Sequence, residues 1–415
     1  MSEDARTAPL ALNIHYFIKW TLISVVIGLT VGAIGTVFGH GVAWATRVWN
    51  RYHWTVFLMP AAGLLIVWLY RACREEKNRG TDMVIEAVSA NEEVTFATAP
   101  LIFISTILSH CVSASLGREG AALQLGGSLG NLIGKVMKLD KKVAVMCGMS
   151  AGFAALFGTP LAAAVFAMEV ISIGVMYYAA LVPCVFSAFL GAALSSRFGL
   201  KAEAFSVGQI PEFGLYGAAL SIFFGILCAC VGIVLCISLH KSGHLYRKYL
   251  PNPFLRILAG SGIFILLTLI FSDRTYNGSG MALIERCFEG EAVPMYAFLL
   301  KILFTAVALG AGFKGGEIVP TLCVGAVFGC TAGTILHAPA GLCTAMGMAC
   351  LFVSVTNCPV STMFLAFEMF GFEAMPYYAL AVGVCFTLSG YYGLYSSQKF
   401  IYSKTRAEYI NRKSH

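Results

Sequence analysis

The chain has 415 residues, of which 58% are hydrophobic and only 12% are charged. So few polar residues cannot cover the surface of a soluble globule of this length, so the composition predicts an integral membrane protein and excludes a soluble one. The net charge of +7 is small, and because no soluble domain offers a basic face, we expect no nucleic-acid binding.

Apolar runs of about 20 residues each mark the expected membrane-spanning helices. In chain order they lie at residues 18–46, 55–72, 98–116, 176–197, 214–239, 254–271, 293–312 and 374–392. Shorter, glycine-rich apolar segments lie between them, at residues 119–137, 143–157, 160–170, 318–336, 341–356 and 359–370. These are too short to cross alone, and irregular backbone at membrane depth survives only where protein or a water-filled cavity surrounds it. We therefore predict an all-α membrane protein with broken helices.

Basic residues are concentrated in three loops, which positive-inside reasoning places in the cytoplasm. They are Arg71, Arg74, Lys77 and Arg79; Lys241, Arg247 and Lys248; and Lys399, Lys404, Arg406, Arg412 and Lys413. A fourth cluster, residues 135–142, is harder to assign to that side. We expect residues 1–14 to be a cytoplasmic N-terminal segment without a signal peptide, and the protein to be a multi-pass protein of the inner (plasma) membrane without a soluble regulatory domain.

The 14 cysteines are scattered through apolar segments without metal or redox spacing. They are small hydrophobic residues in this pattern, so we expect no disulfide framework, no metal site and no cofactor.

The segment from Leu101 to about Leu181 recurs from Leu300 to about Leu380 at one constant offset. The offset is 199 residues, as between Gly117 and Gly316 (316 − 117). Glycine, proline and glutamate stay in register, which chance similarity between apolar segments would not produce. The pattern predicts two repeats, at about 15–200 and 214–398, within one membrane domain at 15–412. It is typical of a transporter whose site lies where broken helices of two repeats meet.

The first candidate motif is the run Gly117, Arg118, Glu119, Gly120. Glycines on both sides of Arg-Glu allow a sharp turn and a new helix start, whose free N–H groups form an anion site. A carboxylate there could occupy that site when ionised and leave it when protonated, so Glu119 is the candidate gate and proton carrier. The alternative is that Glu119 pairs with Arg118 or another cation at a membrane surface.

The second motif is the corresponding run of the other repeat, residues 314–320. Its glycines break the preceding helix, and Pro320 suits the first turn of the next. The N–H groups around Glu317, Ile318 and Val319 could then face the first motif, and two converging positive ends bind an anion without a permanent cation, which would hold it too tightly. Glu317 is either a second ionisable group near the pathway or a carboxylate that satisfies its own helix start.

A third pair of segments begins with a glycine and a hydroxyl residue before an apolar run. In the first repeat they are Gly80 and Thr81, followed by Glu86; in the second, Ser279 and Gly280 precede Glu285. Thr81 could contribute its hydroxyl to the anion, or it could merely cap the helix.

Together these motifs resemble the CLC family of chloride channels and anion/proton antiporters. The similarity rests on the Gly-Arg-Glu-Gly run followed by Gln124 and two glycines, on the Gly316 to Pro320 spacing, and on a tyrosine near the end. It covers roughly residues 15–412 and implies inverted repeats, tilted and broken helices, and a homodimer with one anion pathway in each subunit. The family's terminal tyrosine best matches Tyr395, with Tyr391 and Tyr392 as rivals.

The sequence also departs from the common pattern of that family. Gly80 to Val84 replaces Gly-Ser-Gly-Ile-Pro, Ala121 replaces a proline, and Ile318 replaces a phenylalanine. The inner proton-handling glutamate of the chloride/proton antiporters would fall on Val170, beside Glu169. Because Glu368 lies at the matching position of the other repeat, both glutamates are interpreted as structural helix-end carboxylates, and whether Asp82 faces the pathway stays open.

These departures are similar to the bacterial fluoride/proton antiporter branch. Fluoride is small, strongly hydrated and basic among the halides, so added polar or protonatable groups such as Glu317 and Thr81 would help a site that handles it. The expected activity is fluoride export in exchange for protons. The alternative is a chloride channel or chloride/proton exchanger, and a remote alternative is an intramembrane serine protease built on Ser128 and His110.

Overall fold

The structure, a computed structural model, describes residues 10–90, 92–272 and 274–414. The first repeat contains α1 (Leu10–Arg51), α2 (Met59–Ala72), α3 (Thr81–Ser89), α4 (Thr98–Cys111), α5 (Glu119–Val136), α6 (Lys141–Phe157), α7 (Pro160–Glu169) and α8 (Leu181–Arg197). The second contains α9 (Leu215–Tyr249), α10 (Pro253–Phe271), α11 (Met281–Phe288), α12 (Ala297–Ala311), α13 (Ile318–Ile335), α14 (Ala340–Thr356), α15 (Pro359–Phe370) and α16 (Met375–Leu388). Short 3₁₀ helices lie at His53–Leu58, Tyr178–Ala180 and Arg274–Tyr276.

The helices follow the apolar segments closely, and the differences concern length. Three segments expected to cross the membrane form shorter helices: α4, α12 and α16 have 14, 15 and 14 residues. Conversely, the segment expected to be too short at 318–336 forms α13, which has 18 residues and is long enough to span. Six helices of the described residues are long and apolar enough to cross a membrane. Apolar length alone misjudges these segments because glycine and proline breaks, rather than hydropathy, set the helix ends.

The two repeats meet at a backbone bridge between equivalent residues. The N–H of Gly117 donates to the carbonyl of Gly316 at 2.6 Å, and the N–H of Gly316 donates to the carbonyl of Gly117 at 2.7 Å, in antiparallel register. Two equivalent positions that bond each other reciprocally are what an approximate two-fold rotation between the repeats produces. We call this bridge the seam.

Helix packing is also repeated at positions 199 apart. A Cβ placed on Gly126 would lie 2.1 Å from the carbonyl oxygen of Gly148, and one on Gly325 would lie 2.4 Å from that of Gly347. In each repeat the missing side chain therefore allows the first helix, α5 or α13, to touch the backbone of the next. These glycines are packing residues, as is usual between membrane helices.

Glu169 and Glu368 each bind the start of a helix in the opposite repeat. Glu169, at the end of α7, accepts hydrogen bonds from the N–H groups of Val360 and Ser361 at 3.1 and 2.8 Å. Glu368, near the end of α15, accepts from Leu161 and Ala162 of α7, both at 2.9 Å. The expectation of helix-end carboxylates is met, and their partners are the free N–H groups of the other repeat's helix.

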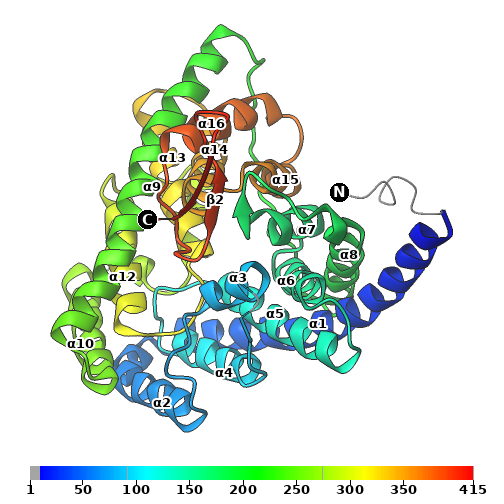
Figure 1. The fold of residues 1–415 in the computed structure, drawn as a ribbon. Coiled ribbons are helices and arrows are strands. Elements are labelled where there is room, and N and C mark those ends of the chain that lie inside the picture. The colour runs from blue at the N-terminus through cyan, green and yellow to red at the C-terminus, as the bar shows by residue number, and fades with distance from the viewer. Residues whose placement is uncertain (1–9, 91, 273, 415) are drawn as a thin grey trace.

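The end of the chain forms a small sheet against the first repeat. Strand β1 (Ser172–Ile173) pairs in parallel with β2 (Lys399–Tyr402), which pairs antiparallel with β3 (Tyr409–Lys413). Figure 1 shows β2 near the centre of the molecule, above α3. The segment that leads into β2 therefore passes over the start of α3, where two of the candidate motifs lie.

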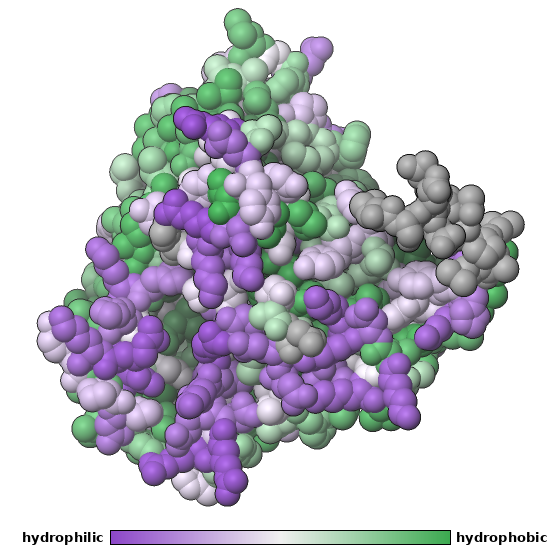
Figure 2. All heavy atoms as spheres, in the orientation of Figure 1, coloured by the Kyte–Doolittle hydropathy of each residue, from purple (hydrophilic) through white to green (hydrophobic). Residues whose placement is uncertain are grey.

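Residues of two basic clusters, Arg79 of the first and Lys135 of the fourth, lie on one face of the molecule. Arg79 pairs with Glu92 at 3.3 Å, and Lys135 pairs with the adjacent Glu93 at 3.1 Å. Figure 2 shows hydrophilic residues gathered across this face, around a hollow. The fourth basic cluster thus lies on the same side as Arg79, which agrees with a cytoplasmic face for both.

Candidate functional site

Three helix starts converge at the seam. Helices α3, α5 and α13 begin at Thr81, Glu119 and Ile318, as the sequence motifs predict. A Cβ on Gly120 would lie 3.0 Å from Cα of Gly316 and 3.4 Å from Oγ1 of Thr81. Free N–H groups and positive dipole ends from three helices therefore face one small region, which suits a single anion.

The carboxylate of Glu119 lies at the start of its own helix. Its Oε2 accepts the backbone N–H of Arg118 at 2.9 Å, and its Oε1 is 3.4 Å from Nε of the same residue. The side chain is only 1% exposed. The pairing with Arg118 considered from the sequence is therefore present, but in the interior and not at a membrane surface. The same carboxylate occupies a helix end that could otherwise bind an anion.

Arg118 has further partners that hold it away from the seam. Its guanidinium donates to Oε1 of Glu203 at 2.7 Å and to the carbonyl of Leu156 at 3.2 Å. Because the guanidinium is shared in this way, Glu119 is not its sole counter-charge. A protonated Glu119 would leave Arg118 paired and would vacate the helix start.

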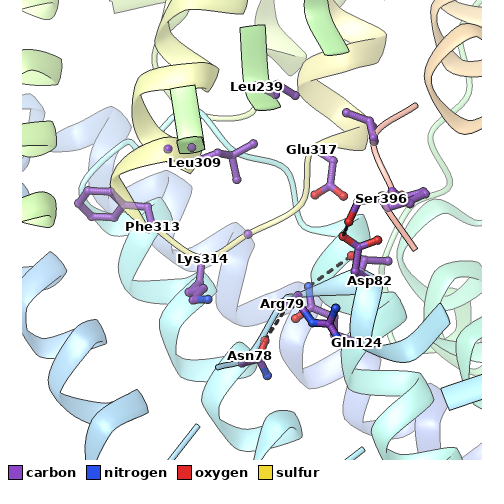
Figure 3. A pocket seen from close by; sticks show the side chains of 18 of the residues that line it. Asn78, Arg79, Asp82, Gln124, Leu239, Leu309, Phe313, Lys314, Glu317 and Ser396 are labelled. Atoms are coloured by element: carbon purple, nitrogen blue, oxygen red, sulfur yellow. Dashed lines mark hydrogen bonds between the residues drawn. The ribbon is translucent and has the colours of Figure 1, made fainter. Parts of the chain in front are cut away.

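Glu317 is the N-cap residue of α13, yet its side chain makes no capping hydrogen bond. Its Oε2 instead lies 3.1 Å from where a Cβ on Gly120 would be, and Figure 3 shows the carboxylate projecting toward Asp82 and Ser396. The carboxylate thus lies beside the cavity and also reaches its own backbone N–H at the start of α13, so both interpretations of Glu317 hold in part. Ile318 and Val319, which follow it, are buried.

Thr81 does not cap α3. Gly80, at φ +68°, is the N-cap residue, and no side chain caps this end. The hydroxyl of Thr81 donates to the carbonyl of Gly120 at 3.5 Å and accepts from Nε2 of Gln124 at 3.4 Å. The capping interpretation of Thr81 is thus wrong, because the left-handed glycine has taken the N-cap place and turned the hydroxyl toward α5. Gln124 is an additional polar group here, and its Oε1 has no partner among the described residues.

Tyr395 is 1% exposed, and its hydroxyl has no hydrogen-bond partner in the part of the chain that the structure describes. A buried phenol hydroxyl without a hydrogen-bond partner lowers the stability of the fold unless a ligand supplies that partner. The rival tyrosines are engaged elsewhere: the hydroxyl of Tyr391 lies 3.1 Å from Oγ of Ser403, and the carbonyl of Tyr392 accepts from Asn357. Tyr395 also lines the same cavity as Thr81 and Glu317.

The segment after Tyr395 is fastened to α3 by Asp82. The carboxylate of Asp82 accepts from Oγ of Ser396 at 2.7 Å and from the N–H of Ser397 at 2.9 Å, and Glu86 accepts from Oγ of Ser397 at 2.8 Å. Asp82 therefore points at the tyrosine segment. Sequence reasoning missed this role because the partners are more than 300 residues apart.

A cavity of about 650 Å³ lies beside these groups (Figure 3). Its lining includes the candidate residues Gly80, Thr81, Asp82, Gln124, Glu317 and Tyr395. Glu119 is absent from that lining and lies at the start of α5, against Gly117 of the seam. Such an arrangement can admit an anion to the start of α3 and the segment before α13, with the ionisable side chain of Glu119 at the neighbouring start of α5.

The two residues of the remote protease alternative each contact a backbone carbonyl. Ser128 donates to the carbonyl of Thr95 at 2.9 Å, and Nδ1 of His110 lies 2.8 Å from the carbonyl of Thr106 in its own helix. Neither contact joins the serine to the histidine, so the pair required for a nucleophile is not formed between them.

Comparison with known proteins gives one consistent result. The family model described as Voltage gated chloride channel matches residues 62–390. A chloride/fluoride channel protein of Pseudomonas syringae pv. tomato is 32% identical over 97% of this chain and 91% of that protein. The H(+)/Cl(−) exchange transporter ClcA of Yersinia pestis is 23% identical over 84% of this chain and 79% of its own.

Solved structures give the same fold. A CLC-type fluoride/proton antiporter superimposes with a TM-score of 0.89 and 29% identity, over 92% of this chain and 98% of that chain. A slow cyanobacterial Cl−/H+ antiporter gives 0.76 at 18% identity, over 89% and 94%. At that identity the second likeness supports the fold alone.

Proposed function

The chain belongs to the voltage gated chloride channel family, which is the CLC family, and from that premise we propose that it exports fluoride in exchange for protons. Membership makes it a multi-pass anion transporter and not an enzyme. We propose the fluoride substrate, the coupling to protons and the roles of single residues.

The observation that carries the proposal is the position of the Glu119 carboxylate. It accepts the N–H of Arg118 at the start of α5, where an anion would otherwise be bound. Ionised, it competes with the anion; protonated, it loses its charge and can move aside. Each exchange of carboxylate for anion then moves a proton one way and an anion the other.

Fluoride is supported by the polar groups around the anion position. The Tyr395 hydroxyl, which can donate to an anion, lacks a partner among the described residues, and the Thr81 hydroxyl and Glu317, a donor only when protonated, line the same cavity. A strongly hydrated ion needs such groups to replace its water. We propose that Gly80, Thr81, Gly117, Arg118, Gly120, Gly316, Glu317, Ile318, Val319 and Tyr395 form the anion-binding region. The fluoride named in two of the similar proteins agrees with this choice.

The second candidate is a chloride channel or chloride/proton exchanger, which the name of another relative favours. Fluoride and chloride efflux measured in the same liposomes separates the two. We expect faster fluoride efflux, with proton uptake against a proton gradient when fluoride leaves. Chloride efflux that matches or exceeds fluoride efflux would overturn the choice of fluoride, and anion efflux without proton uptake would overturn antiport.

We also propose, from the family resemblance, that two copies assemble in the inner (plasma) membrane, each with its own pathway. Mass measured in detergent tests the assembly. A single-chain mass with full transport activity would exclude a required dimer.

A further inference from the structure

One wall of the cavity carries cations that no carboxylate neutralises. Lys314 lies in the linker before α13, Arg256 on α10 and Arg247 at the end of α9, and all three line the cavity. Among the described residues, none of the three forms an ion pair within 4 Å of a carboxylate, and Nε of Arg256 is buried without a hydrogen-bond partner. We call these residues the cation wall.

The cation wall is separated from the acidic groups of the cavity. Figure 3 shows Lys314 on the side away from Glu317, Asp82 and Ser396. The ammonium of Lys314 stacks over the ring of Tyr70 at 4.5 Å, which holds it in place without cancelling its charge. Two carboxylates of the cavity lining already have other partners: Asp82 accepts from Ser396 and Ser397, and Glu76 pairs with Arg71 at 3.5 Å.

Unpaired cations on the wall of a partly enclosed cavity attract anions and raise their local concentration. At the helix starts a permanent cation would bind the anion too tightly for release, whereas at the entrance it only needs to hold the anion briefly. We propose that Lys314, Arg256 and Arg247 form a second anion-binding site, which captures the transported halide before it reaches the helix starts. This proposal rests on the proposed transport function but not on fluoride being the substrate.

The experiment measures the half-saturating concentration and the maximum rate of anion flux from the side that the cavity faces. Arg256→Met and Lys314→Met remove one charge each and keep an unbranched chain. We expect each to raise the half-saturating concentration about threefold to tenfold, with a maximum rate within about twofold of the original. Lys314→Arg, which keeps the charge, should restore the original value. Lys248→Met is the matched control, because Lys248 is an exposed neighbour of Arg247 outside the cavity lining, and it should change neither value.

Salt dependence tests the unaltered protein, so a variant that misfolds does not remove the test. Added inert salt of a large, untransported anion should raise the half-saturating concentration of the original chain and raise that of Arg256→Met less, because one of the three charges that it screens is gone. A half-saturating concentration that ignores both salt and substitution would overturn the proposal.

Two outcomes distinguish halide capture from phosphate binding and from the choice of fluoride as substrate. In the first, inorganic phosphate inhibits anion flux in the original chain but not in Arg256→Met, and the variants keep the original half-saturating concentration of halide. The cation wall would then be a phosphate site, and halide capture would be wrong. If the unaltered chain carries chloride and not fluoride, the fluoride assignment fails, and the same variants measured with chloride still decide on capture.

Discussion

The two repeats are alike where they hold each other and unlike where they face the anion. At the seam, Gly117 and Gly316 make the same hydrogen bond in both directions, and Glu169 and Glu368 bind each other's helix starts in the same way. At the helix starts beside the seam the equivalence stops: Glu119 corresponds to Ile318, and Glu317 to Arg118. Duplication thus supplies a scaffold of converging helix ends, and later divergence within it places the ionisable groups.

Gly316→Ala tests the seam, where the two repeats are alike, and should have the largest effect. The new Cβ would lie 2.6 Å from the backbone nitrogen of Gly120, so the two helix starts must separate, and we expect a loss of at least about 1–3 kcal/mol of stability and of most transport. Gly262→Ala in α10 is the control, because nothing lies within 4 Å of its Cβ position. Thermal denaturation followed by size-exclusion chromatography measures both, and equal behaviour of the two variants would contradict the seam.

The unlike half is tested by Glu119→Gln. The amide cannot ionise, so it neither competes as a charge nor carries a proton, and we expect proton uptake in liposomes to fall to the protein-free background while anion flux persists. Glu203→Gln is the matched control, since Glu203 also contacts Arg118 but lies outside the helix start. If both variants keep proton uptake, Glu119 is a structural partner of Arg118 and no more.

Glu169 and Glu368 each bind the start of the other's helix, and replacing either one should cause a similar, smaller loss of stability. Glu169→Gln and Glu368→Gln each replace a carboxylate that accepts two backbone N–H groups, and hydrogen bonds to charged groups contribute about 1.5–3 kcal/mol. We expect each variant to lower the thermal midpoint similarly, whereas Glu373→Gln, an exposed neighbour, should leave it unchanged. A loss in only one of the two would show that the repeats are not equivalent at this contact.

Glu317→Gln should have the smallest effect on stability. Because the side chain makes no capping hydrogen bond to the first turn of α13, we expect the midpoint of thermal denaturation to move by less than the equivalent of about 0.5 kcal/mol, while the anion flux changes several-fold through the altered charge beside the cavity. A stability loss of about 1 kcal/mol with unchanged flux would show that Glu317 acts only at its own helix start.

Local sequence signals predicted the architecture well because they are local. Glycines before Glu119 and Ile318 mark the starts of α5 and α13, and the constant offset assigned those two starts to equivalent places. The contacts that complete the site were not predictable in this way. Gln398 bonds the carbonyls of Val170 and Thr356, and Asp82 bonds Ser396; these pairs are far apart in the chain and carry no shared pattern.

One error and one omission have the same physical cause. Capping was one of the two roles considered for Thr81 from its position after a glycine, but only the three-dimensional turn at Gly80 decides which residue is the cap. Lys301 was not singled out at all, although it is fully buried in α12 and donates to the carbonyls of Tyr276 and Gly278 at 3.2 and 2.7 Å. Burial and partner identity are tertiary properties, so a single residue type does not reveal them.

The seam also limits the amplitude of the working cycle. Parting the repeats would break the two Gly117–Gly316 bonds together with the four N–H bonds to Glu169 and Glu368, at a combined cost of several kcal/mol or more. Rotating one carboxylate about its side-chain bonds breaks far fewer. In the proposed exchange the seam would therefore act as a fixed frame around one moving side chain, without the large rocking of domains that other duplicated transporters use.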